Sequence, residues 1–128
     1  MRCTSSLQAR LEVGLREEGF TPTQFGILEA VFHLGPLEPC ELGPKLLTSR
    51  PNVVLLVDQL EERGLVRRKP VETDRRRVRI ELTPAGRLAI DRAFQKHARR
   101  VVQELSALSA AEQERLGRLC KRLGRRHQ

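Results

Sequence analysis

The sequence has no tyrosine and no tryptophan, and only four phenylalanines among its 128 residues. Proteins that bind single-stranded nucleic acid usually stack bases on aromatic side chains, so this scarcity disfavours that class of ligand. Long apolar runs are missing as well. The longest uninterrupted apolar stretch, residues 53–57, has five residues, whereas a membrane-spanning helix needs roughly 18. We therefore expect no membrane partner.

Cysteine is also scarce. The three cysteines, Cys3, Cys40 and Cys120, are odd in number and have no metal-ligand spacing, so we expect a reduced, cytoplasmic protein without a metal or other cofactor. The chain offers no paired carboxylates in an apolar setting and no glycine-rich phosphate loop. These absences predict no catalytic residues and disfavour an enzyme.

The sequence does contain a local excess of positive charge. The net charge is +8, and residues 63–79 alone hold eight basic residues against two acidic ones, a net +6. A solvated face is the ordinary explanation of a charged segment. Here the charge has one sign and lies on one short segment, where a polyanion would relieve its self-repulsion. Because aromatic side chains are few, the sequence favours duplex DNA as that polyanion.

Residues 49–63 predict the helix around which the rest is organised. Ser49 is a favoured N-cap, and Pro51 suits the first helical turn, where its missing N–H is not needed. Apolar residues then recur at spacings of three and four, which places one face of the helix in the core. Gly64 supplies the left-handed residue that ends the helix.

The residues that follow predict a β-hairpin. Apolar and polar residues alternate over 78–82, which is typical of a half-buried strand, with 65–66 as the partner strand and 73–75 as the turn. A helix that leads into an arginine-rich hairpin has the outline of a winged helix. The predicted fold class is mainly α with a small β-hairpin wing.

The other segments predict further helices, some with clear end signals. Thr21 with Gln24, and Ser109 with Glu112, form capping boxes. Pro44 interrupts the third helix, which we expect either to be very short or to begin near Glu41. Gly124 is expected to follow the end of the last helix. The predicted helices cover residues 5–18, 21–34, 38–47, 84–105 and 109–123.

The outer helices carry apolar stripes that a small central domain cannot cover. We expect them to pack against a second copy in a homodimer, whose two-fold axis would match a pseudo-palindromic operator. The residues expected at this interface are Leu7, Leu11, Val102, Leu105, Leu116, Leu119 and Leu123.

Asp74-Arg75-Arg76 is followed by alternating apolar residues and then by Leu-Thr-x-x-Gly, which ends at Gly86. This motif, together with residues 49–66, resembles the MarR family of winged helix-turn-helix transcriptional regulators, and the resemblance extends over about 7–123. It implies one domain over 1–128, with a DNA-binding core at about 21–83 and dimerisation helices at about 5–18 and 84–123. It also implies a sequence-specific repressor that a small-molecule ligand or another signal releases.

The resemblance assigns roles to matching residues. Arg76 matches the wing arginine that enters the minor groove, although a solvated arginine remains the alternative. Asp74 matches the acid that orients the wing through an ion pair, although it equally fits a turn-former. Arginines and the lysine at the hairpin base are expected to meet phosphates. The residues expected at the DNA are Ser49, Arg50, Asn52, Val54, Leu55, Arg67, Arg68, Lys69, Arg75, Arg76 and Arg77.

The recognition helix departs from the family pattern. Val54 and Leu55 stand where the family often has Thr and Arg, and apolar side chains can contact thymine methyls but cannot form bidentate hydrogen bonds to purines. Members that bind phenolic ligands often use Tyr or Trp, which this chain lacks. A ligand pocket would have to use residues that fit ordinary core or surface roles better: Phe20, Phe25, Phe32, His33 and His97.

Two alternatives to a ligand-responsive repressor remain. An architectural protein that coats DNA without specificity would explain the charge, but not the acid in the wing motif. A thiol-based redox regulator would use Cys40, which lies near the start of the third helix, where the helix dipole favours a reactive thiolate. Cys120, on the apolar face with Leu119 and Leu123, is expected to be buried and inert.

Overall fold

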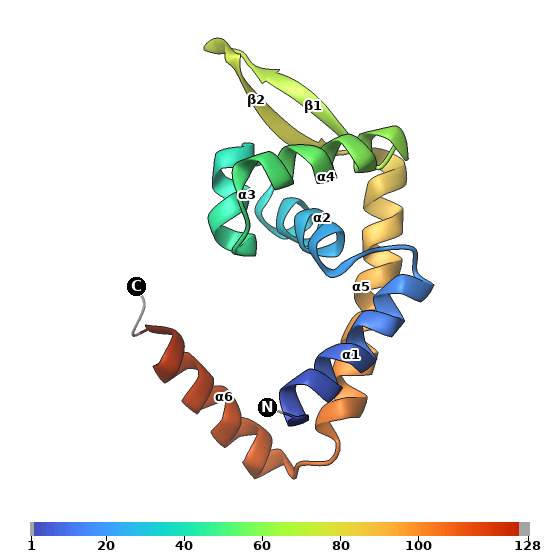
Figure 1. Cartoon of the computed structure of the whole chain (residues 1–128), viewed down its shortest axis with the longest axis vertical. Coiled ribbons are helices and arrows are strands. Elements are labelled where there is room, and N and C mark those ends of the chain that lie inside the picture. The colour runs from blue at the N-terminus through green and yellow to red at the C-terminus, as the bar shows by residue number, and fades with distance from the viewer. Residues whose placement is uncertain (1, 126–128) are drawn as a thin grey trace.

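The computed structural model describes residues 2–125, without the side chains of residues 2–5. This part of the chain forms a two-stranded antiparallel hairpin and a set of helices (Figure 1). The mainly α fold with a β-hairpin wing is therefore confirmed. In chain order the elements are α1 (Arg2–Glu17), α2 (Pro22–Leu34), α3 (Pro39–Leu46), α4 (Arg50–Glu62), β1 (Val66–Val71), β2 (Asp74–Leu82), α5 (Pro84–Leu105) and α6 (Ala110–Arg125).

The core lies where α2, α3 and α4 meet the hairpin base and the first half of α5. The helical spacing predicted for α4 holds, since Val53, Val57 and Leu60 are fully buried. The other fully buried large side chains come from the neighbouring elements, and they are Ile27 and Leu28 of α2, Leu42 of α3, Val66 of β1, Ile80 of β2 and Ile90 of α5.

The hairpin is anchored at its base and projects at its tip. Ile80 of β2 exchanges backbone hydrogen bonds of 3.2 and 2.7 Å with Leu37, which ties the wing to the segment before α3. The strands are longer than expected, so the turn lies at 72–73 and the prediction of 73–75 was wrong. Most side chains near the tip are exposed, and alternation of apolar and polar residues therefore does not mark this part of the strands.

The third helix has eight residues, so the first of its two predicted forms, a very short helix, is confirmed, and the start near Glu41 is not. It begins at Pro39, and the side chain of Glu41 accepts a hydrogen bond from the backbone N–H of Glu38 in a capping box. Pro44 is accommodated inside this helix. The last helical residue is Leu46, and the following Leu47 has a left-handed φ of 53° and an almost fully exposed side chain.

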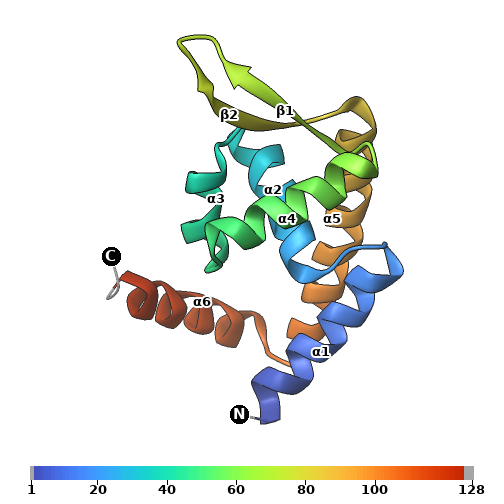
Figure 2. The ribbon, with the colours of Figure 1, turned by 45° about the horizontal axis from the view of Figure 1, so that its top comes forward.

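Helix α1 lies along α5, and α6 turns back from the end of α5 (Figures 1 and 2). Ion pairs between Arg10 and Glu104 at 2.9 Å and between Lys96 and Glu18 at 3.1 Å join α1 to α5. Helix α6 begins with the predicted Ser109 capping box but continues past Gly124 to Arg125, so the predicted stop at Gly124 was wrong. A glycine can remain helical at a cost of about 1 kcal/mol.

No helix within residues 2–125 combines the length and the apolar character that crossing a bilayer requires. No group of three His, Cys, Asp or Glu side chains in that range is arranged to hold a metal ion.

Candidate nucleic-acid interface

The N-terminal turn of α4 is built by local hydrogen bonds. The Ser49 hydroxyl accepts from the backbone N–H of Asn52 at 3.3 Å, as its position before Pro51 predicted. The Asn52 side-chain amide donates to the Thr48 hydroxyl at 2.8 Å. Two of the three polar residues of this turn that are expected at the DNA, Ser49 and Asn52, thus also hold the turn itself. Arg50 is exposed and forms no ion pair within residues 2–125. Farther along, Val54 and Leu55 are partly exposed.

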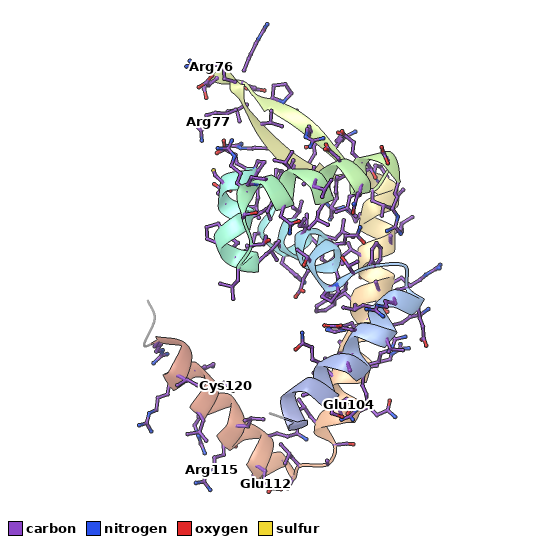
Figure 3. All side chains as sticks on the ribbon, in the orientation of Figure 1. Arg76, Arg77, Glu104, Glu112, Arg115 and Cys120 are labelled. Atoms are coloured by element: carbon purple, nitrogen blue, oxygen red, sulfur yellow. The ribbon has the colours of Figure 1, made fainter. Side chains whose placement is uncertain are left out.

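The hairpin tip carries an arginine whose side chain is almost fully exposed. The Arg76 side chain is 92% exposed, and Figure 3 shows it at the tip. The Asp74 carboxylate accepts from the Arg76 backbone N–H at 3.0 Å and from its Nε at 3.3 Å. Asp74 therefore acts within the hairpin itself, where it shapes the tip and holds the base of the Arg76 side chain. The two terminal nitrogens of the guanidinium form no ion pair within residues 2–125.

Arg77 points back toward the helices. Its Nε and terminal nitrogen donate to the two carboxylate oxygens of Glu38 at 2.9 and 2.6 Å, in a bidentate pair. Glu38 lies just before α3 and is buried. The Arg77 hydrogen bond lowers the pKa of Glu38 below its ordinary value, with smaller contributions from Arg79 and Arg50. This pair fixes the wing against α3.

The arginines at the hairpin base are paired as well. Arg67 forms an ion pair with Glu81 of the opposite strand. Arg68 bonds Asp58 and, at 2.8 Å, Glu61, both on α4. Its backbone N–H also donates to Glu61 at 3.1 Å. Arg68 thus ties β1 to the recognition helix, and much of its charge is balanced inside the chain.

A small cavity of about 230 Å³ lies between α3 and the wing. Its lining includes four arginines, Arg50, Arg68, Arg76 and Arg77, against one acid, Glu38, and the exposed Cys40 forms part of its wall. The structure therefore gathers residues from three elements into one positively charged surface. Lys69 and Arg75 are exposed on the same hairpin.

The five residues proposed for a ligand pocket do not form one site. Phe25 and His97 pack together at 4.9 Å between ring centroids and line a cavity between α1, α2 and α5. Phe20 is buried beneath the Arg63 guanidinium. Phe32 and His33 belong to another aromatic cluster, which includes Phe94.

The apolar residues assigned to a dimer seam remain uncovered in the single chain. Leu116, Leu119 and Leu123 of α6 are 41, 49 and 65% exposed, and Val102 of α5 is 67% exposed. Leu7, Leu11 and Leu105 are half-buried. Cys120 is exposed, as Figure 3 shows on α6, so its predicted burial is wrong for the isolated chain, in which α6 has no buried residue.

The sequence did not single out some of the residues that build these sites. Glu38 was considered only as the start of a helix, although a carboxylate before α3 pairs with an arginine 39 positions away. Glu12 and Glu29, which line the cavity beside His97, were also missed. Their signal was weak, because a glutamate on an amphipathic helix usually faces solvent.

Comparisons with known proteins agree with this geometry. The model of the MarR family matches residues 20–78. The HTH-type regulator YkoM of Bacillus subtilis is 36% identical over 85% of this chain and 71% of its own length. The HTH-type regulator MhqR of the same organism is 30% identical over 96% of this chain and 85% of its own length. A Pseudomonas aeruginosa crystal structure, described as a "probable transcriptional regulator", is 29% identical with a TM-score of 0.82, covering 94% of this chain and 93% of that one. The chain belongs to the MarR family of transcriptional regulators.

Proposed function

We propose that the protein is a homodimeric repressor that binds a pseudo-palindromic operator in duplex DNA. The observation that carries this proposal is the exposed positive charge that Arg50, Arg75 and Arg76 place at the start of α4 and on the wing. Arg50 and Arg75 have no ion-pair partner within residues 2–125, and the Arg76 guanidinium projects from the tip. They lie at the N-terminus of α4 and on the wing, the two elements with which a winged helix contacts a duplex.

Each element has its own task in this proposal. The start of α4 enters the major groove, where Arg50 meets a purine edge and the exposed Val54 and Leu55 contact thymine methyls. Arg76 enters the adjacent minor groove, where a narrow A·T-rich segment deepens the negative potential. Lys69 and Arg75 meet phosphates, which position the dimer without carrying sequence information.

The test is a selection of bound duplexes from a random pool, followed by anisotropy titrations of the selected operator against an unrelated duplex. The expected result is a two-fold symmetric motif, strong preference for the operator, and a fall in log affinity with log salt of slope magnitude about five to ten. A slope near one or two would mean that the wing does not touch DNA. Equal affinity for both duplexes would instead favour the architectural function.

We further propose that a small molecule controls this binding from the cavity between α1, α2 and α5. Support comes from its position, because α1 and α5 belong to the proposed dimer module and α2 belongs to the DNA-binding core. A ligand wedged among the three helices would change the angle between these modules, and with it the spacing of the two recognition helices. The measurement is operator affinity with and without a ligand.

A further inference from the structure

The cavity between α1, α2 and α5 has a volume of about 350 Å³ and a mainly apolar wall. Helix α1 contributes Leu7, Leu11 and Leu15, which lie one helical turn apart on one face. Helix α2 contributes Phe25, and α5 contributes His97. A cavity of this size lined by leucine and phenylalanine side chains fits a small molecule with a hydrocarbon or aromatic body.

The charged groups of the wall all have one sign. Glu12 of α1 and Glu29 of α2 line the cavity, and no lysine or arginine does. Glu12 accepts a hydrogen bond of 2.9 Å from the neutral amide of Gln8. Glu29 forms no ion pair within residues 2–125. Both carboxylates are half-buried, where a missing counter-ion costs more than it would in open solvent.

The basic residues of α5 on either side of His97 are engaged elsewhere. Lys96 pairs with Glu18 at 3.1 Å. The Arg100 guanidinium donates to the Gly14 carbonyl at 3.0 Å and lies 3.4 Å from Glu17. These cations therefore belong to the α1–α5 contact and leave the cavity carboxylates without a close positive partner.

His97 adds an unsatisfied atom to the wall. Its Nδ1 is buried and has no hydrogen-bond partner within residues 2–125. Burial lowers the pKa of His97 below its ordinary value and so favours the neutral imidazole, which has one donor and one acceptor nitrogen. Buried polar atoms nearly always have a partner in folded proteins. The imidazole therefore has unused hydrogen-bonding capacity at the edge of the cavity.

We propose that the cavity binds a small apolar amine in its protonated form, with the hydrocarbon body beside Leu15 and Phe25 and the ammonium group beside Glu12 and Glu29. The ammonium carries several N–H donors, which suit carboxylate oxygens and a neutral imidazole. A carboxylate or phenolate of the same shape would instead add a like charge to a half-buried acidic site. This inference rests on the proposed control of DNA binding by a ligand in the same cavity, and it names the ligand's class.

The test compares three probes that share one ring system: naphthylmethylamine, naphthylmethanol and naphthoate. The full-length protein is titrated at pH 7 while naphthalene fluorescence is followed, which is clean because the chain has no tyrosine or tryptophan. The amine is expected to bind on the order of tenfold more tightly than the alcohol, and the naphthoate more weakly than either. A naphthoate that binds as tightly as the amine would overturn the proposal. The absence of binding by all three probes would overturn it as well, and would indicate that a second copy of the chain fills the cavity.

Substitutions assign the charge selectivity to the cavity. Glu29→Gln should reduce amine affinity about tenfold while leaving the affinity for the alcohol within about twofold. The matched control is Glu62→Gln, which neutralises an exposed acid on α4 outside the cavity. If Glu29→Gln and Glu62→Gln have the same effect, the carboxylate is not part of the site. Duplex binding is measured in parallel: intact DNA binding without amine binding overturns only this inference, whereas absent DNA binding overturns the proposed function.

Discussion

At the scale of single residues, Gly86 is the position where packing leaves the least room. A Cβ atom there would lie 1.8 Å from the carbonyl oxygen of Leu65, a backbone atom that cannot rotate away. The Gly86 N–H also donates to the Thr83 hydroxyl at 3.0 Å, and that hydroxyl donates to the Gly64 carbonyl at 2.6 Å. The glycine of the wing motif therefore lets α5 start directly against the link between α4 and β1.

Gly86→Ala should lower the free energy of unfolding by about 1–3 kcal/mol or more, because the methyl group forces the backbone of α5 away from Leu65. Urea denaturation followed by circular dichroism measures this change. Gly117→Ala is the matched control, since nothing lies within 4 Å of its added Cβ. In a helix interior that change should stabilise by about 0.5–1 kcal/mol. Equal effects of the two substitutions would contradict the packing argument.

The Glu38–Arg77 pair predicts a pH dependence of stability. The folded-state pKa of Glu38 is lowered by Arg77, so the pair stabilises the fold fully above the unfolded pKa of about 4.3 and loses its effect as pH falls through the folded value. The stability gap between the wild type and Glu38→Gln should therefore be largest near neutral pH and should shrink below about pH 4. Urea denaturation across this range measures it. A gap that stays constant with pH would mean that the carboxylate charge does not matter.

Residue roles were predictable from sequence where they depend on near neighbours. The caps at Thr21, Ser49 and Ser109 are such cases, because each hydroxyl accepts from a backbone N–H three residues later. The partner of Arg77 was not predictable, because Glu38 precedes it by 39 positions and only the fold brings the two together. The same holds for Arg68, whose acids lie on another element.

At the scale of elements, the hairpin divides its arginines between two tasks. Arg76 is exposed at the tip and pairs only with Asp74 of its own strand, whereas Arg68 bridges β1 and α4 through Asp58 and Glu61. The sequence predicted a phosphate contact for Arg68. The paired geometry favours a positioning role instead, in which Arg68 sets the angle between wing and recognition helix.

This division predicts different results for two alanine variants. Arg76→Ala should leave the melting temperature unchanged, weaken operator binding by about 1–3 kcal/mol, and reduce the salt slope by about one. The loss should be greater on an operator with A·T flanks than on one with G·C flanks. Arg68→Ala should cost on the order of 1 kcal/mol of stability and weaken DNA binding without changing the salt slope. If Arg68→Ala makes the slope shallower at unchanged stability, Arg68 contacts a phosphate after all.

Element boundaries were predictable to the extent that local signals mark them. Proline and capping residues located the starts of α2, α4, α5 and α6. The length of the strands was not predictable, since β2 begins in the arginine run at Asp74, where neither face is apolar. Pro44 correctly predicted a short α3 as one of two forms, since a proline breaks a long helix more severely than it disturbs an eight-residue one.

At the scale of the whole molecule, α6 is the element that the single chain leaves without a packing partner. It has no buried residue, although its start is held to the end of α5 by two hydrogen bonds from Gln113, to Leu105 at 2.9 Å and Leu108 at 3.1 Å. Leu116, Leu119 and Leu123 lie on one face of it. An amphipathic helix gains most of its stability from packing, so its exposed face predicts a partner helix.

If that partner is a second copy, one acid on α6 should separate the subunits. Leu119→Asp would bury an unpaired charge in the dimer seam. We expect a monomer at micromolar concentration by sedimentation equilibrium, and a loss of operator binding, because each monomer reaches only one half-site. Lys121→Asp is the matched control, since it adds an acid to the polar side of the same helix and should leave the dimer intact. A Leu119→Asp protein that remains dimeric, or that binds the operator as a monomer with unchanged affinity, would show that α6 is not the element that joins two DNA-binding cores.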